Sequence, residues 1–175
     1  PDSAISRQLA YWTDRLKDLP EQLDLPLDRP RPAVSSFRGD SMALMLAAEL
    51  HGGLLALARD SGASLFMLLQ AGLAALLTRL GAGTDIPIGS PIAGRNRPEV
   101  EGLIGFFVNT LVLRNEVAGK ESFLEVLKGE RETALGAYQH AEVPFEMLVE
   151  SLAPERDTSR SALFQVMFVL QTAGG

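Results

Sequence analysis

The sequence predicts an α/β fold in which helices and a sheet pack in layers. Two predicted strands, Ile104–Arg114 and Leu163–Leu170, carry apolar side chains on both faces. Such strands are typical of a sheet that is covered on both sides. Other segments have the apolar spacing of helices, and Leu65–Leu80 is the most apolar of them. Helices that alternate with buried strands predict a layered α/β domain.

The composition fits one globular unit. The chain has 175 residues, of which 46% are hydrophobic and 22% charged. A net charge of −6 argues against a nucleic-acid partner, because phosphate binding needs a concentrated basic face. There is no cysteine, so we expect no disulfide and no thiolate metal site, which fits a cytoplasmic protein. The apolar run Leu65–Leu80 is too short and too interrupted for a membrane span, so no membrane partner is expected.

The first sixty residues predict a helix, an extended strap and a second helix. Ile5–Leu19 has amphipathic helical spacing, and the proline-rich segment Pro20–Gly39 cannot be helical. Ser41–Leu46 is predicted to be a short strand, and Glu49–Asp60 a helix. His51, near the start of that helix, is predicted to be a surface or capping residue.

The middle of the chain predicts a buried helix followed by a strand. Ser64 is expected to cap the helix Leu65–Leu80, which is apolar nearly all round and so should be buried. The strand Ile86–Ile92 contains Pro87 and Pro91. Because proline lacks an N–H group, this strand is expected at an edge of the sheet, or to leave the sheet early.

The last third predicts two helices and a buried strand. Ser122 is expected to cap a helix that runs to about Gln139, and a short helix is expected to begin at about Pro144. Gln165 is the lone polar residue inside the apolar strand Leu163–Leu170.

Asn109 is a lone amide within the predicted strand Ile104–Arg114. A buried amide needs partners for its oxygen and for its two N–H donors. Asn109 therefore either holds neighbouring backbone or faces a cavity, and the first interpretation is favoured because most buried polar groups are satisfied.

The residues alone predict no self-sufficient catalytic site. His140 has Glu142 and Glu146 nearby, but these carboxylates are expected to stabilise a helix start. A triad of His140 with Asp157 and a neighbouring serine has no spacing that supports it. Arg95 and Arg97 could hold a phosphate or carboxylate, although composition alone favours a solvated loop for both.

Four stretches resemble the condensation domains of nonribosomal peptide synthetases. Ser90–Arg114 resembles the family's isoleucine-glycine-x-phenylalanine-valine-asparagine-threonine motif. His140–Glu150 is similar to its histidine-glutamine-x-valine-proline-phenylalanine-glutamate motif, and Arg156–Phe168 to its arginine-aspartate-x-serine-arginine motif. Ala10–Gly39 matches the tyrosine-tryptophan helix and the proline strap between the family's lobes. The resemblance covers almost the whole chain.

Two departures from these motifs are small. Ala141 stands where glutamine is usual and Ala162 where proline is usual. These departures bear on the subtype of condensation domain and not on membership of the family. The family's catalytic motif, histidine-histidine-x-x-x-aspartate-glycine, is found nowhere, since the histidines are His51 and His140 alone. In the family that motif belongs to the amino-terminal lobe.

The resemblance implies a fold and a reaction. In this family two lobes, each like chloramphenicol acetyltransferase, form a V, and the amine of a carrier-tethered acceptor attacks the thioester of a carrier-tethered donor. This chain is then one lobe of a two-lobed domain. Residues 1–39 are its amino-terminal helix and inter-lobe strap, and residues 40–175 are a partial second lobe. Since the chain lacks an initiator Met, it is expected to begin inside a longer polypeptide or after processing. Because the catalytic motif is missing, it is expected to be inactive alone.

The resemblance also assigns residues. Arg95 matches the arginine that braces the aspartate of the catalytic motif across the lobe interface, and Asn109 matches the tunnel-side asparagine. No catalytic or metal-binding residue is carried over. The remaining motif positions are expected to be structural: His140, Pro144, Phe145, Arg156, Asp157 and Gln165.

The implied partners are other parts of a synthetase. They are the amino-terminal lobe, the donor and acceptor carrier proteins with their phosphopantetheine, and a neighbouring adenylation domain. No cofactor is expected on this chain itself. Apolar surface meant for the missing lobe predicts self-association of the fragment.

Two alternatives stay open. Epimerisation and heterocyclisation domains share the fold, although the intact phenylalanine-valine-asparagine-threonine stretch favours condensation. A non-catalytic module that docks carriers or neighbouring domains is the other alternative.

Overall fold

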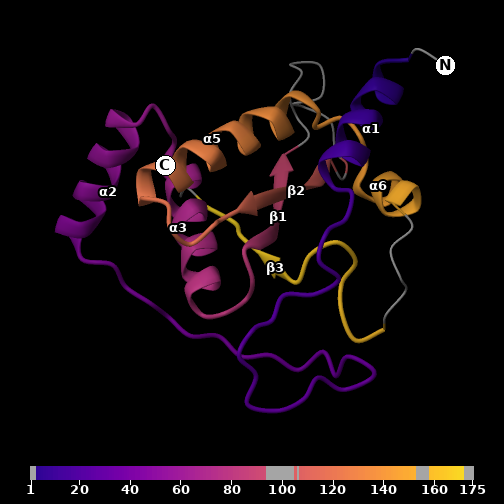
Figure 1. Cartoon of the computed structure of the whole chain (residues 1–175), viewed down its shortest axis with the longest axis horizontal. Coiled ribbons are helices and arrows are strands. Elements are labelled where there is room, and N and C mark those ends of the chain that lie inside the picture. Colours follow the sequence, from indigo (N-terminus) through magenta and orange to yellow (C-terminus); the bar gives the residue numbers. More distant parts are fainter. Residues whose placement is uncertain (1–2, 94–104, 106, 153–157, 172–175) are drawn as a thin grey trace.

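The computed structural model describes residues 3–93, 105, 107–152 and 158–171, and it confirms the α/β fold (Figure 1). Its elements in chain order are α1 (Ala4–Arg15), α2 (Ala48–Asp60), α3 (Leu65–Arg79), β1 (Asp85–Ala93), β2 (Val108–Glu116), α5 (Phe123–Gln139), α6 (Phe145–Leu152) and β3 (Val166–Met167).

Strand β1 lies in the middle of the sheet, in the order β2-β1-β3. It pairs antiparallel with β2 over its whole length. Strand β3 pairs in parallel with β1 at two residues only, Ile88 and Gly89. Helices α3 and α5 pack on each other and on the sheet, whereas α1 packs on α6. The sheet is therefore covered by helices, as its apolar strands predicted.

The edge position predicted for the strand with two prolines is wrong, since β1 lies between β2 and β3. The backbone N–H of Phe168 donates to the Gly89 carbonyl at 2.9 Å, so the polar groups of Gly89 face β3. Pro87 and Pro91 lie two residues to either side and face the same way, because strand backbone groups alternate in direction. Their missing N–H groups leave the β2 pairing intact and keep the β3 pairing short.

Three further predictions differ from the structure in length or in kind. Ser41–Leu46 is not a strand, because it pairs with no strand in the described residues. The expected strand Leu163–Leu170 pairs only within β3, and Leu163 has a φ of 67°, which is incompatible with extended backbone. Helix α1 ends at Arg15, four residues early, and Asp18 just beyond it has a φ of 55°.

The helix starts agree with the predicted caps. The Ser64 hydroxyl accepts a hydrogen bond from the Met67 amide at 3.2 Å at the start of α3. At the start of α5, the Ser122 hydroxyl accepts from the Glu125 amide, and the Glu125 carboxylate accepts from the Ser122 amide. This reciprocal pair is a capping box, which satisfies two N–H groups that the helix leaves without partners.

Helix α3 is a core helix, as predicted. It buries the side chains of Met67, Leu68, Gln70, Ala71, Ala74 and Leu77. In the described part of the chain, no single helix has the length and apolar character to cross a membrane. Helices α2 and α3, bent by 105° at their junction, pass that test only when taken together, by length and composition alone.

The core consists of two clusters of buried side chains on the sheet. One lies between α3, α5 and β1 and includes Leu68, Ala71, Ile86, Ile88 and Leu127. The other joins α1 and α6 to β2 and includes Trp12, Leu16, Leu113, Leu148 and Phe164. Helix α1 is thus part of the core; the division of the chain at residue 39 remains a prediction.

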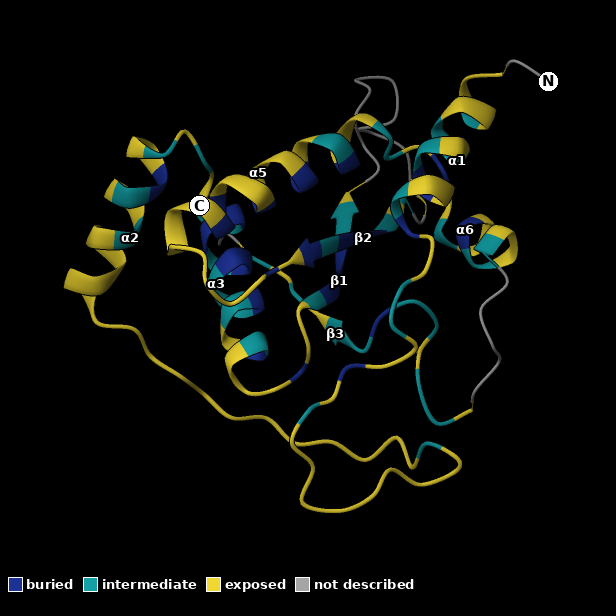
Figure 2. Ribbon diagram, in the orientation of Figure 1, coloured by how far each residue is buried: buried dark blue, intermediate teal, exposed yellow. Residues whose placement is uncertain are grey.

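The proline-rich strap is tied down over its first half. The Leu23 amide donates to Gln165 Oε1 at 3.1 Å, and the Ser35 amide donates to the Thr158 carbonyl at 3.1 Å. Beyond Ser35 the chain arcs away from the body toward α2 (Figure 1), and residues 36–47 are all exposed (Figure 2).

Gly89 is required by the close approach of an aromatic ring. A Cβ atom at this position would overlap the ring of Phe164, which is itself buried. Phe164 in turn packs on Phe145 of α6, with ring centroids 5.6 Å apart. A side chain at Gly89 would therefore displace the link between the sheet and α6.

We expect Gly89→Ala to lower the free energy of unfolding by about 1–3 kcal/mol, because the methyl group overpacks the site of Phe164. Urea denaturation of the chain would measure this. The control is Gly72→Ala in α3, where a Cβ meets no atom within 4 Å. That change should stabilise the helix by about 0.5–1 kcal/mol. Equal effects at both positions would contradict the role given to Gly89.

Candidate functional site

Asn109 holds the turn between α5 and α6 against β2. Its Nδ2 donates to the carbonyls of Ala141 at 3.0 Å and Val143 at 2.8 Å. Its Oδ1 accepts from the amides of Thr110 at 2.9 Å and Phe145 at 3.1 Å. Both donors and the acceptor are used, which confirms that the amide holds neighbouring backbone. We call this set of bonds the Asn109 clamp.

The clamp sets the start of α6. Pro144 precedes the first residue of this helix, as predicted, and its carbonyl accepts from the amide of Met147 at 3.0 Å. The Phe145 amide has no partner inside the helix because it lies in the first turn. Asn109 supplies that partner at 3.1 Å, so the first turn of α6 has a fixed position relative to β2.

His140 links α1 to the end of α5. Its ring stacks on Tyr11 with centroids 3.8 Å apart and an interplanar angle of 6°. Its Nδ1 lies 2.7 Å from the carbonyl of Gly136, and its own carbonyl accepts from Trp12 Nε1 at 2.7 Å. A Cβ atom at Gly136 would lie 2.5 Å from the Tyr11 hydroxyl. These contacts hold His140 in place between two helices.

The acidic neighbours of His140 in sequence have other contacts. Glu142 exchanges two hydrogen bonds with Gln8 of α1, at 3.0 and 3.1 Å. Glu146 lies in the first turn of α6, where a negative charge is favourable next to the helix N-terminus. This is the helix-stabilising role predicted for that residue.

Gln165 joins the strap to the chain before β3. Its Oε1 accepts from the Leu23 amide at 3.1 Å, and its Nε2 lies 3.5 Å from the carbonyls of Glu21 and Ser161. The lone polar residue of the predicted strand is therefore a bridge between segments far apart in sequence.

Other predicted residues cannot be placed. Arg95, Arg97, Arg156 and Asp157 lie outside the described residues. In the described ranges, no group of three or more His, Cys, Asp or Glu side chains is arranged to hold a metal ion.

Arg114 was not predicted to matter, although it joins the sheet to the end of α1. Its guanidinium binds both carboxylate oxygens of Asp85, with the shortest contact 2.7 Å, and donates to the carbonyls of Arg15 and Lys17. The hydrogen bond to Asp85 raises the pKa of Arg114 above its usual value. The signal in the sequence was a single arginine at the end of an apolar strand.

Glu130 on α5 is 1% exposed, and neither of its carboxylate oxygens has a hydrogen-bond partner among the described residues. Asn115 faces it, but that amide donates to the carbonyls of Ile86 and Leu113. Burial raises the pKa of Glu130 to about 8, and the nearby charge of Arg15 offsets only part of this rise. The charged neighbours of Glu130 in sequence gave no sign that it is buried.

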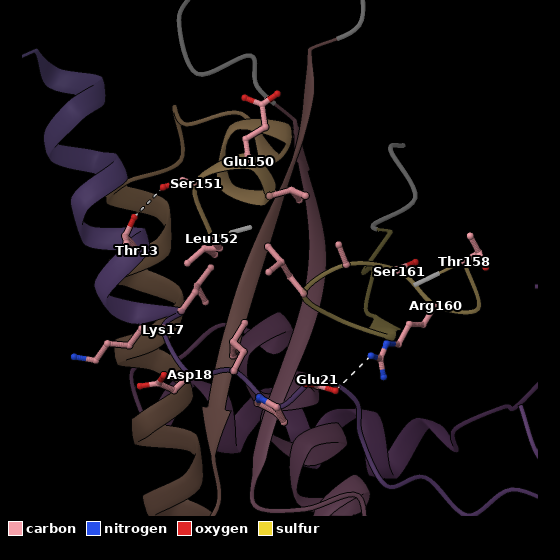
Figure 3. Close-up of a pocket in the computed structure, with 16 residues that line it drawn as sticks. Thr13, Lys17, Asp18, Glu21, Glu150, Ser151, Leu152, Thr158, Arg160 and Ser161 are labelled. Carbon is pink, nitrogen blue, oxygen red and sulfur yellow. Dashed lines mark hydrogen bonds and ion pairs between the residues drawn. The ribbon is translucent and has the colours of Figure 1, made fainter. Parts of the chain in front are cut away.

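A cavity of about 1030 Å³ lies between the end of α1, the start of the strap, the end of α6 and residues 158–163 (Figure 3). At one side Thr13 and Ser151 hydroxyls lie 3.4 Å apart. At the other, Arg160 lies 3.6 Å from the Glu21 carboxylate and donates to Gln22 at 3.1 Å. The charge of Arg160 is therefore paired with that of Glu21 at the edge of the cavity.

The fold and these contacts define a class of protein: a condensation-type domain with the chloramphenicol acetyltransferase-like fold, since the solved structures that superpose on the chain have this fold. The family model of the Condensation domain matches residues 2–174. The chain belongs to the condensation domain family.

The similar curated proteins are nonribosomal peptide synthetases. A probable non-canonical synthetase of Salinispora arenicola is 54% identical over 98% of this chain. A dimodular synthase of Bacillus subtilis is also 54% identical over 98% of the chain. The chain spans only 2% of the first relative and 7% of the second.

Solved structures agree over most of the chain. A four-domain nonribosomal peptide synthetase, 28% identical, superposes on 100% of the chain with a TM-score of 0.94, and the chain covers 13% of it. The X-domain from teicoplanin biosynthesis is 38% identical over 95% of the chain, with a TM-score of 0.89. The chain covers 37% of that structure.

We expect Asn109→Ala to lower the free energy of unfolding by about 2–4 kcal/mol, because the buried groups of the α5–α6 turn lose their partners. Urea denaturation measures the change. Gln139→Ala, which removes an exposed amide at the end of α5, is the control and should stay within about 0.5 kcal/mol of the parent. A similarly small change for Asn109→Ala would show that the clamp contributes little.

Glu130 predicts a stability that falls as pH rises. The pKa of Glu130 is about 8 in the folded chain against 4.5 for the free side chain, so the folded state binds the proton more tightly. The stabilising contribution of protonated Glu130 is fully present below about pH 4.5 and is lost as the pH rises to about 8. Over this range the free energy of unfolding falls by at most about 1.4 kcal/mol per pH unit. Thermal unfolding from pH 5 to 8.5 measures the loss.

The variant Glu130→Gln should remove this part of the pH dependence, because an amide does not titrate. Glu132→Gln changes an exposed glutamate two residues away and should leave the slope as it is. A slope that is unchanged in Glu130→Gln would refute the assignment.

Proposed function

We propose that this chain is the carboxy-terminal lobe of a condensation domain that joins two carrier-tethered groups through an amide bond. The observation that carries the proposal is the family match over residues 2–174, together with relatives that are nonribosomal peptide synthetases. In the reaction the acceptor amine attacks the thioester carbonyl of the donor. A C–N bond forms, the C–S bond breaks, and the thiol of the donor carrier leaves with a proton.

Asn109 serves this reaction as a positioning residue. Both of its N–H donors and its oxygen are bonded to the backbone of the chain, which leaves no group free to bind a substrate. By resemblance it lies beside the tunnel, and its contribution is to fix the junction of β2 and α6 there. Arg95 is proposed to brace the aspartate of the catalytic motif from this side of the interface.

The chain lacks the base that the reaction uses. Its histidines are His51, exposed on α2, and His140, which is stacked on Tyr11 and bonded through Nδ1 to Gly136. His140 is therefore proposed to be structural. The paired-histidine motif is expected in an amino-terminal lobe that pairs with this one, and without that lobe the chain is inactive.

The proposed partners follow from this role. They are the amino-terminal lobe, a donor and an acceptor carrier protein, each carrying phosphopantetheine, and an adenylation domain in the same cytoplasmic synthetase. The chain by itself is proposed to bind no cofactor. Residues 1–175 alone are proposed to self-associate through exposed apolar side chains, and a monomer at high concentration in light scattering would contradict this.

A docking module without catalysis is the second candidate. One solved neighbour is a complex of the X-domain and OxyB from teicoplanin biosynthesis, and its X-domain superposes on 95% of the chain with a TM-score of 0.90. A fold of this kind therefore binds a partner protein in at least one relative. Saturable binding of a carrier protein to the isolated chain would favour this candidate. Epimerisation and heterocyclisation remain alternatives within the same fold.

Incubation of loaded donor and acceptor carriers with two proteins tests the proposal. Residues 1–175 alone should form no amide product, since the catalytic histidines are missing. The longer polypeptide that supplies a paired-histidine motif should form it. Turnover by residues 1–175 alone would overturn the proposed inactivity, and no product from the longer polypeptide would overturn the proposed reaction.

A further inference from the structure

The turn that joins α5 to α6 is held on one side by β2 and on the other by α1, which lies beside α6 (Figure 1). The β2 side is the Asn109 clamp, whose Nδ2 donates to the carbonyls of Ala141 at 3.0 Å and Val143 at 2.8 Å. The clamp therefore holds the carbonyl groups of the odd-numbered residues in the turn.

Helix α1 holds the even-numbered residues. Trp12 Nε1 donates to the carbonyl of His140 at 2.7 Å, and the His140 ring stacks on Tyr11. The Glu142 amide donates to Oε1 of Gln8 at 3.1 Å, and Nε2 of Gln8 donates to the Glu142 carboxylate at 3.0 Å. Gln8 is thus bonded to both the backbone and the side chain of one residue in the turn.

Gln8 and Asn109 bind the two ends of a single peptide group. The Ala141 carbonyl, which accepts from Asn109, and the Glu142 amide, which donates to Gln8, belong to the same peptide bond. A trans peptide group is planar and rigid, and its C=O and N–H point in opposite directions. The side-chain amide of Gln8, this peptide group and the side-chain amide of Asn109 therefore form one continuous chain of hydrogen bonds, in which each bond polarises the next.

This chain of bonds joins two parts of the molecule that the family resemblance places at important positions. Helix α1 contains the start of the segment that matches the tyrosine-tryptophan helix between the lobes, and Asn109 matches the tunnel-side asparagine. A displacement of α1 would pull the peptide group through Gln8, and Asn109 would lose its alignment with the turn.

We propose that Gln8 is a positioning residue for the condensation reaction, which couples α1 to Asn109 through the peptide group between Ala141 and Glu142. The inference rests on the proposed function, because the tunnel and the lobes come from the resemblance. Gln8 acts through Asn109 and not on a reacting group. The physical coupling of Gln8 to Asn109 is separate from the reaction and has a test of its own.

A reciprocal exchange of side chains tests the pair. Gln8→Glu removes the N–H donor and places a second carboxylate next to that of Glu142, which repels it. Adding Glu142→Gln should restore the pair with donor and acceptor exchanged, because the new amide donates to the new carboxylate. The control is Asp14→Asn, the same kind of change at an exposed residue of α1 that pairs with Lys17 at 3.2 Å.

Hydrogen exchange in residues 1–175 measures the coupling without the reaction. The reporter is the Phe145 amide, which donates to Asn109 and not to Gln8. Gln8→Glu should speed its exchange about tenfold, and the double variant should return it to the parent rate. Asp14→Asn should leave it unchanged, as should Gln8→Glu for the amide of Ala74, which is buried in α3. An unchanged Phe145 rate in Gln8→Glu, or equal acceleration at Ala74, would overturn the coupling.

Turnover in the longer polypeptide that carries the paired-histidine motif tests the positioning role. Gln8→Glu should lower kcat about tenfold, because a misplaced turn misaligns the site. The KM for each loaded carrier should stay within about twofold of the parent, since carrier binding is not altered. The double variant should recover the parent kcat, and Asp14→Asn should retain it.

The outcomes separate the two proposals. Parent turnover with an unchanged kcat in Gln8→Glu would overturn the positioning role alone. No product from the parent would overturn the proposed reaction and the positioning role together, and hydrogen exchange would still decide the coupling. Should Gln8→Glu fail to fold, Gln8→Ala replaces it in both experiments, because it removes both bonds without adding a charge.

Discussion

The amide of Asn109 is the contact on which the arrangement of the second half of the chain depends. It satisfies two carbonyls of the α5–α6 turn and the first free amide of α6. This places Phe145, whose ring packs on Phe164, which fills the space above Gly89 in the central strand. One polar side chain in an apolar strand thus sets the relation of a helix to the sheet. Its cost of burial is offset because all of its hydrogen-bonding groups are used.

A second group of polar contacts ties the sheet to the first helix. Arg114 holds Asp85 within the sheet and the carbonyls that follow the end of α1, while Arg15 returns a bond to the Arg114 carbonyl at 3.1 Å. Arg15 also lies near Glu130, which is buried and has no hydrogen-bond partner in the part of the chain that the structure describes. The amino-terminal helix is therefore held by charge as well as by the burial of Trp12 and Leu16. The family match from residue 2 onward is consistent with one unit.

Local signals in the sequence predicted the local features. Ser64 and Ser122 identified the starts of their helices, because a cap depends only on residues three positions away. The clamp role of Asn109 followed from the needs of a buried amide, although its partners could not be named. The central position of β1 could not be predicted, since it depends on which edge Pro87 and Pro91 face. Glu130 was missed for a related reason: its burial depends on α3 and β2, which are distant in sequence.

Because of its prolines, strand β1 forms a long pairing along one of its edges and a short pairing along the other. Toward β2 every alternate residue of β1 retains its N–H group, and the pairing runs along all nine residues. Toward β3 the prolines on either side of Gly89 remove donors, and the pairing is confined to two residues. Strand β3, and the strap that is bonded to Gln165 beside it, are therefore held on the β1–β2 pair by few contacts. Separating β3 from β1 therefore breaks few bonds between strands, whereas separating β1 from β2 breaks the pairing of all nine residues.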